Sequence, residues 1–157
     1  MCGGVFDVYR ESCMKILVAF GSLAVAAFGV WTLAFNIRGR RREREIVLER
    51  GKQTASDFAA LFPDLEQQQV AEKLFAYLQR GTFTRHFSFR KDDFLWKPPL
   101  EFVPDNLEDD LNEGFWAELG VGLALANDEE KRSVFSSQTV AELVAAITNL
   151  YSSRHPD

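Results

Sequence analysis

The hydrophobic positions of this chain form one long uninterrupted block followed by several short periodic groups. The block runs from Ile16 to Ile37 without a charged residue, between Lys15 and Arg38. A bilayer core about 30 Å thick requires roughly 20 apolar residues in a helix that rises about 1.5 Å per residue. Because the block has that length, we predict one transmembrane helix over residues 16–37.

The charges on the two sides of the block predict its orientation. Upstream, the tail of residues 1–15 carries two basic and two acidic side chains. Five arginines that would face anionic lipid headgroups follow the block: Arg38, Arg40, Arg41, Arg42 and Arg44. Because clustered arginines resist translocation, we expect an exported tail and a cytoplasmic C-terminal domain. The pattern is typical of a single-pass protein of the cell membrane, with a bacterial inner membrane favoured.

A cleaved secretory signal is the alternative explanation of the block. Such a signal carries its positive charge before a shorter apolar core and ends in small residues at the cleavage site. Here the arginines follow the core, and the block ends in Phe35, Asn36 and Ile37. The pattern therefore favours a retained anchor.

Arginine and glutamate alternate after the block at spacings that favour a helix. We expect the membrane helix to continue to Gly51, so that residues 38–56 form a basic juxtamembrane helix and a hinge. Ser56 is expected to cap a short turn over residues 57–62.

The next apolar stripe predicts a helix over residues 64–80, with Pro63 at its first position and Gly81 as its stop. Its apolar residues recur at helical spacing: Val70, Ala71, Leu74, Phe75 and Leu78.

Two further helices are expected towards the C-terminus, with a short one over residues 128–134 between them. Asp105 is expected to cap the first, which ends at Gly120. Its apolar residues share one line: Leu107, Leu111, Phe115 and Leu119. Thr139 and Glu142 form a capping box for the second. Its buried stripe is predicted to contain these residues: Val140, Leu143, Val144, Ile147 and Leu150.

Between the helices the apolar period changes to two, because Phe83, Phe87 and Phe89 occupy alternate positions. This period predicts either a short strand or an extended Phe-rich loop that packs on the helices. Prolines make residues 91–104 irregular, with Trp96 holding them against the core. The predicted fold class is mainly α: one N-terminal transmembrane helix followed by a small helical bundle with a minor strand or extended loop.

Charge separates the chain into two regions. Residues 57–157, the expected cytoplasmic domain, carry 9 Lys and Arg against 18 Asp and Glu, whereas residues 1–52 carry 9 against 5. Phosphate binding requires a basic stripe, so the acidic domain argues against nucleic acid as a partner. We expect membrane lipid to contact the arginines and to repel the domain.

Acidic residues concentrate between Lys97 and Lys131, where there are ten carboxylates and no basic residue. Their spacing does not match a calcium-binding EF-hand loop. We hypothesise that part of this segment docks a protein partner with a basic surface. The candidate partner-binding residues are Asp105, Glu108, Asp109, Asp110 and Glu113. A merely solvated helix face is the alternative.

Residues that carry chemistry are sparse. The two histidines, His86 and His155, have no nucleophile in a recognised context beside them. Cys2 and Cys13 lack the spacing of a zinc site, although an exported tail would allow a disulfide. We therefore predict no catalytic, metal-binding or cofactor-binding residues, and no enzyme activity.

Two runs resemble the second half of an acyl-carrier-protein-like domain: DNLEDDLNEGFWAELGV, from Asp105, and SSQTVAELVAAI, from Ser136. The resemblance covers residues 64–151. It implies a small helical bundle with an acidic docking face. In carriers an Asp-Ser-Leu triplet opens the second helix and its serine bears phosphopantetheine. This chain has Asp109, Asp110 and Leu111 there, so the resemblance does not extend to the carrier chemistry.

These observations favour a membrane-anchored protein whose acidic domain acts as a non-catalytic interaction module. The alternative is a tethered domain that binds a small molecule or acyl group, with Trp96, Trp116 and the Phe-rich segment lining its pocket. A neutralising partner for a basic toxin or enzyme would share the same acidic surface.

Overall fold

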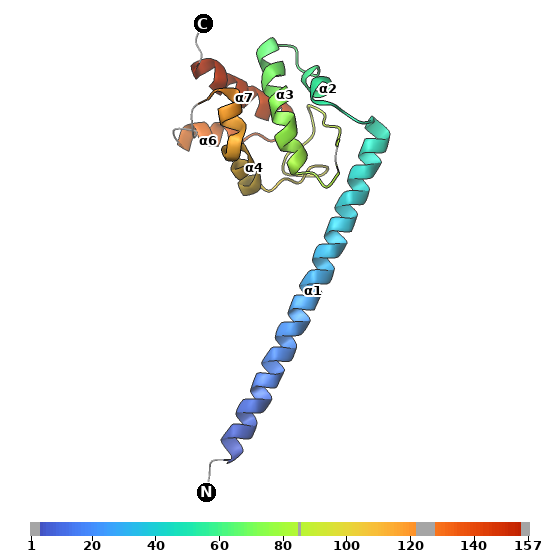
Figure 1. The fold of residues 1–157 in the computed structure, drawn as a ribbon, viewed down its shortest axis with the longest axis vertical. Coiled ribbons are helices and arrows are strands. Elements are labelled where there is room, and N and C mark those ends of the chain that lie inside the picture. The colour runs from blue at the N-terminus through green and yellow to red at the C-terminus, as the bar shows by residue number, and fades with distance from the viewer. Residues whose placement is uncertain (1–3, 85, 122–127, 155–157) are drawn as a thin grey trace. The chain divides into compact units, whose positions relative to one another are not determined.

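The computed structural model describes residues 4–84, 86–121 and 128–154. These residues are mainly helical, at 71% helix, and contain no β-strand. The chain divides into two compact units, residues 1–39 and 40–157. Figure 1 shows one long helix and a group of shorter helices.

The long helix, α1, spans Gly4–Arg50. Its end confirms the predicted continuation past the apolar block, because Gly51 follows in a left-handed conformation with φ +84°. The helix also includes most of the predicted tail, since it begins at Gly4. One part of the prediction, that residues 51–56 form a hinge without helix, needs correction because a new helix begins at Ala55.

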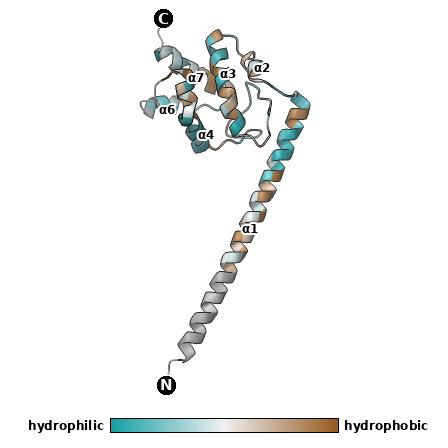
Figure 2. Cartoon of the chain, in the orientation of Figure 1, coloured by the Kyte–Doolittle hydropathy of each residue, from teal (hydrophilic) through white to brown (hydrophobic). Residues whose placement is uncertain are grey.

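The described part of α1 holds a helix long and apolar enough to cross a membrane. Its large apolar side chains are exposed, including Phe20, Val25 and Trp31. A core helix of a soluble protein would meet the same length criterion but would be buried, whereas no part of this apolar window is. A signal sequence would also meet it. Figure 2 shows the apolar stretch giving way to a polar C-terminal end of the helix.

The second helix, α2, spans Ala55–Ala59. The predicted cap at Ser56 is wrong, because Thr54 is the N-cap. The Thr54 hydroxyl accepts a hydrogen bond from the Asp57 amide at 3.1 Å, and the Asp57 carboxylate accepts one from the Thr54 amide at 2.9 Å. This reciprocal box satisfies two amides at once, which a cap two residues later would leave unpaired.

The third helix, α3, spans Leu65–Arg80 and buries every residue of its predicted stripe. Pro63 is not its first residue, because Asp64 is the N-cap. Gly81 ends the helix as predicted, but with φ −75° rather than in a left-handed turn. A Cβ at Gly81 would lie 2.5 Å from the Phe102 ring, so the close approach of that ring requires the glycine.

The Phe-rich segment is an irregular loop, so the strand alternative is wrong. Phe87 and Phe89 are buried in the core, whereas Phe83 is 43% exposed. The residues after it are irregular as predicted, and the Trp96 Nε1 donates a hydrogen bond to the Ser137 carbonyl at 2.6 Å. The only β-type pairing in the described ranges is an isolated bridge from Phe94 to Thr139.

The helix predicted from Asp105 to Gly120 is divided into three parts: α4 over Pro104–Asp110, a π-helical turn η1 over Leu111–Phe115, and α5 over Trp116–Leu119. Asp105 is not the cap, since Val103 is the N-cap and Pro104 occupies the first position. Gly114 has non-helical backbone angles inside η1 and thereby interrupts the helix. The predicted apolar line is nevertheless buried throughout, and Gly120 ends α5 with φ +81°.

The last two helices agree with the prediction, except that Leu150 of the predicted buried stripe is only partly buried. Helix α6 spans Asp128–Phe135 and α7 spans Val140–Arg154. The Thr139 hydroxyl accepts from the Glu142 amide at 3.3 Å, and the Glu142 carboxylate accepts from the Thr139 amide at 3.4 Å. Helix α3 packs against both α2 and α7 and also contacts α4, so it is central to the core.

Candidate functional site

The last turns of α1 belong to the folded unit of residues 40–157 and present one face to the rest of that unit. Glu43, Ile46, Val47 and Arg50 lie at i, i+3, i+4 and i+7, so they share that face. Ile46 and Val47 pack against the core. We call the contact between residues 42–53 and the loop of residues 82–84 and 86–101 the seam.

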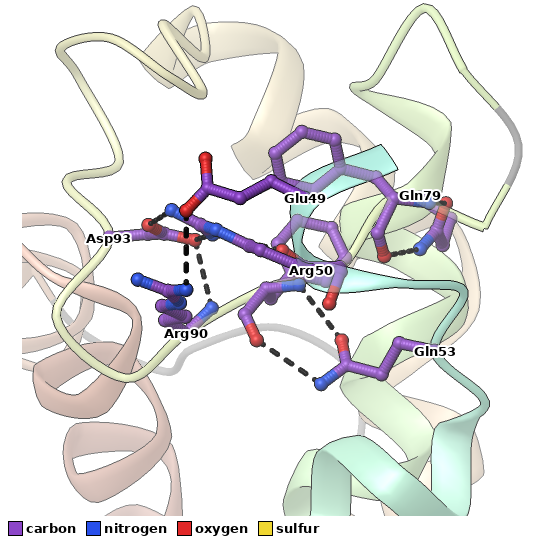
Figure 3. Close-up of polar contacts among 9 residues, drawn as sticks. Glu49, Arg50, Gln53, Gln79, Arg90 and Asp93 are labelled. Atoms are coloured by element: carbon purple, nitrogen blue, oxygen red, sulfur yellow. Dashed lines mark hydrogen bonds and ion pairs between the residues drawn. The ribbon is translucent and has the colours of Figure 1, made fainter. Parts of the chain in front are cut away.

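An ion pair between Arg50 and Asp93 lies within the seam (Figure 3). The two guanidinium nitrogens of Arg50 donate to the two carboxylate oxygens at 2.6 and 2.9 Å. Arg50 also donates to the Ser88 carbonyl at 2.9 Å, and Asp93 accepts from the Arg90 amide at 2.8 Å. The Asp93 side chain is only 5% exposed. A buried ion pair is tolerated when further hydrogen bonds satisfy both groups, as they do here.

Two glutamines hold the Phe-rich loop by its backbone (Figure 3). Gln53 donates to the Phe89 carbonyl at 3.1 Å and accepts from the Phe89 amide at 2.8 Å. Gln79 pairs with Phe87 in the same way, at 2.7 and 3.0 Å. Each side-chain amide takes the place that a neighbouring strand would occupy, which explains how a period-two segment is buried without a sheet.

Glu43 is the other charged side chain of the seam, and it is 2% exposed. Its Oε2 is buried and has no hydrogen-bond partner among the described residues. Burial raises the pKa of this carboxyl, against smaller opposing contributions from the Phe83 backbone and from the hydroxyl and backbone of Thr84. Residue 43 lies beyond the apolar block and within the folded unit.

The sequence did not single out Arg50, Asp93, Gln53, Gln79 or Glu43. One signal was present, because Glu43 and Arg50 fall on the helical face that also holds the two apolar residues Ile46 and Val47. The partners of Gln53 and Arg50 are 36 and 43 residues away in the chain, beyond the reach of local patterns, whereas Gln79 and Phe87 are 8 residues apart.

The five predicted membrane-surface arginines do not have equal surroundings. Arg42 pairs with Glu101 at 3.0 Å, so it contributes to the seam. The other four are exposed: Arg38, Arg40, Arg41 and Arg44.

The five predicted partner-binding residues all lie on α4 and η1. Glu108 pairs with Lys131 at 3.3 Å, and Asp110 lies 3.9 Å from Arg80. Asp105, Asp109 and Glu113 are exposed and lie at i, i+4 and i+8. Within the described ranges these three make no ion pair.

The next question is whether the described residues bring metal-binding or acid-base side chains together. In the part of the chain that it describes, no group of three or more His, Cys, Asp or Glu could hold a metal ion. His86 is exposed and has φ +65°. Cys2, His155 and the side chain of Cys13 lie outside the described residues.

The aromatic residues of the predicted pocket pack mostly within the core. Phe87 and Phe89 lie with ring centroids 5.0 Å apart, and Phe89 contacts Phe58 at 5.7 Å. Trp116 is 2% exposed and donates to Asn112 at 3.2 Å. Trp96 is half-buried at the edge of the core.

No protein-family model matches the chain, and no curated protein or solved structure matches it significantly. The resemblance to acyl-carrier domains therefore stays a prediction. Asp109 and Asp110, at the place of the carrier triplet, lie at the end of α4 rather than at the start of a helix.

Proposed function

We propose that this chain is a single-pass membrane protein whose acidic helical domain serves as a non-catalytic interaction module. The apolar, exposed helix α1 supports the anchor, and the arginines that follow it support a cytoplasmic domain. The acidic face of α4 and η1 is the surface that would meet a basic protein partner.

The observation that carries the docking surface is the unequal pairing of its five acidic residues. Glu108 and Asp110 face cations of the same domain, which reduces their field at a distance. Asp105, Asp109 and Glu113 follow one another at intervals of four residues along α4 and η1 and remain exposed. Unpaired like charges in a row raise the local potential and steer a cationic partner towards that line.

Charge reversal of Asp109 and Glu113 tests this surface. We expect the variant Asp109→Lys/Glu113→Lys to lose most of the protein partners that crosslink to the full-length chain in intact membranes, measured by mass spectrometry of the copurified proteins. Both side chains are exposed, so the domain should fold normally.

A matched control reverses Glu72 and Asp92, which are also exposed but lie on α3 and in the loop before Trp96. It changes the net charge by the same amount and should retain the partners. Equal recovery of partners by both double variants would rule out the α4 and η1 face. A bound small molecule or acyl group without any protein partner would favour the alternative function.

A further inference from the structure

Glu43 stands out among the buried groups of the domain. Across the described residues, its Oε2 is the only buried side-chain polar atom without a hydrogen-bond partner. In the ion pair of the seam, by contrast, both terminal nitrogens of Arg50 and both carboxylate oxygens of Asp93 have hydrogen-bond partners. The seam therefore contains one group whose ionised form is poorly accommodated.

Among the described residues no cation forms an ion pair with Glu43, and its neighbours Arg40 and Arg44 on α1 are exposed. Three ion pairs occupy the surrounding elements: Arg42 with Glu101, Arg50 with Asp93, and Arg90 with Glu49. At the end of α3, Arg80 lies beside Asp110. On the loop itself, His86 is exposed. The Phe83 backbone and the hydroxyl and backbone of Thr84 form hydrogen bonds with Glu43, but they carry no charge and their effect is smaller than that of burial. No described cation thus lies at ion-pair distance from this carboxyl.

A buried carboxylate without a cation is unfavourable, whereas the neutral acid is tolerated. Ile46 and Val47, one turn further along the same face, bury apolar surface only while α1 is docked. Docking of these turns and protonation of Glu43 are therefore linked, because undocking would return the carboxyl to water.

We propose that Glu43 makes the seam a pH-sensitive clasp, in which the neutral acid favours docking of the last turns of α1 and the ionised carboxylate weakens it. The clasp does not depend on the identity of any partner. Through this one side chain, the pH around the domain would determine how firmly the last turns of α1 are docked.

The direction of the effect follows from the pKa. The carboxyl has an ordinary pKa of 4.5 when exposed and a raised pKa when docked. The stabilisation from the neutral acid is fully present below the exposed value and is lost as pH rises through the docked value. Each unit by which docking raises the pKa weakens docking about tenfold at high pH.

Hydrogen exchange of the full-length chain in detergent micelles tests the clasp. We would measure peptides from residues 40–52, corrected for intrinsic exchange, from about pH 5 to about pH 8. The Glu43→Gln variant removes the titration, and Glu45→Gln is the matched control because Glu45 is exposed two residues away.

At about pH 8, Glu43→Gln should protect the seam peptides about tenfold more than the unmodified chain for each unit of pKa shift, and the difference should close towards about pH 5. Glu45→Gln should follow the unmodified chain, and peptides of α7 should not change in either variant. A protection ratio that is the same at every pH, or lower protection in Glu43→Gln at high pH, would overturn the proposal.

A second variant covers the case in which a buried glutamine unfolds the domain. Glu43→Leu removes both the charge and the polar atoms, so its seam peptides must also lose the pH dependence attributed to Glu43. If the pH dependence of the unmodified chain persists in Glu43→Leu, another group controls the seam and the clasp is wrong.

Discussion

Arg50 and Asp93 show how a single contact joins distant parts of this chain. Their side chains are 13% and 5% exposed and meet through two short hydrogen bonds. They are 43 residues apart in the chain, and neither position carries a local signal for the other. The pair could not be predicted from the sequence, because sequence patterns report which face a residue occupies and not which residue it meets.

Removing Asp93 should destabilise the domain far more than removing Glu101. Asp93→Ala leaves the largely buried Arg50 guanidinium with the Ser88 carbonyl but without its carboxylate, and loss of one partner of a buried ion pair typically costs about 3–5 kcal/mol. Glu101→Ala breaks an ion pair whose side chains are 45% and 40% exposed, so the expected loss is about 0–1 kcal/mol. Urea unfolding, followed by the fluorescence of buried Trp116, measures both free energies.

The double variant Arg50→Met/Asp93→Leu separates pairing from packing. It removes both charges while keeping similar volume, so it should recover most of the stability lost in Asp93→Ala. Equal losses in Asp93→Ala and Glu101→Ala would mean that the buried pair does not hold the seam.

At the scale of elements, the helices could be predicted, but the starts of α2, α3 and α4 could not. Apolar residues at helical spacing report a buried face directly, which is why the stripe of α3 is confirmed throughout and that of α7 is confirmed except at Leu150. Caps depend on one hydrogen bond, and several neighbouring residues of the right type compete for it. Thr54 is the N-cap rather than Ser56, because only Thr54 has a carboxylate, that of Asp57, three residues later.

The Phe-rich loop explains why strand and loop could not be separated from the sequence. Its period of two is that of a strand, and its two central phenylalanines are buried as they would be in one. The hydrogen-bond partners come instead from the side chains of Gln53 and Gln79. Such a replacement depends on side chains outside the segment, so no pattern within it reveals the outcome.

Replacing Gln79 tests this role. Gln79→Ala leaves the buried amide and carbonyl of Phe87 without partners, so it should destabilise the domain by about 1–3 kcal/mol in urea unfolding. The control is Gln69→Ala, on the same helix but exposed, which should change stability by less than about 0.5 kcal/mol. Equal effects of the two variants would show that the glutamine does not hold the loop.

At the scale of the whole molecule, an apolar block long enough for an anchor is followed by an arginine cluster and then by an acidic domain. The anchor was predicted from an uninterrupted apolar block, and the structure agrees in placing exposed apolar side chains on a helix of sufficient length. The proposed docking face depends on which carboxylates are paired. That could not be predicted, since Lys131 and Arg80 meet Glu108 and Asp110 only through the fold.

The most direct test of the account is the accessibility of cysteines in intact cells to a maleimide that cannot cross membranes. The native Cys2 and Cys13 report the N-terminal side, and a cysteine introduced by Glu72→Cys, in a chain with both native cysteines replaced by serine, reports the domain. Glu72 is exposed on α3, so its replacement should not disturb the fold.

We expect the native cysteines to be labelled in intact cells and the cysteine at position 72 to be labelled only after lysis. The chain should also stay with the membranes after an alkaline wash. Labelling at position 72 in intact cells, or release of the chain by the wash, would contradict a membrane-anchored cytoplasmic module.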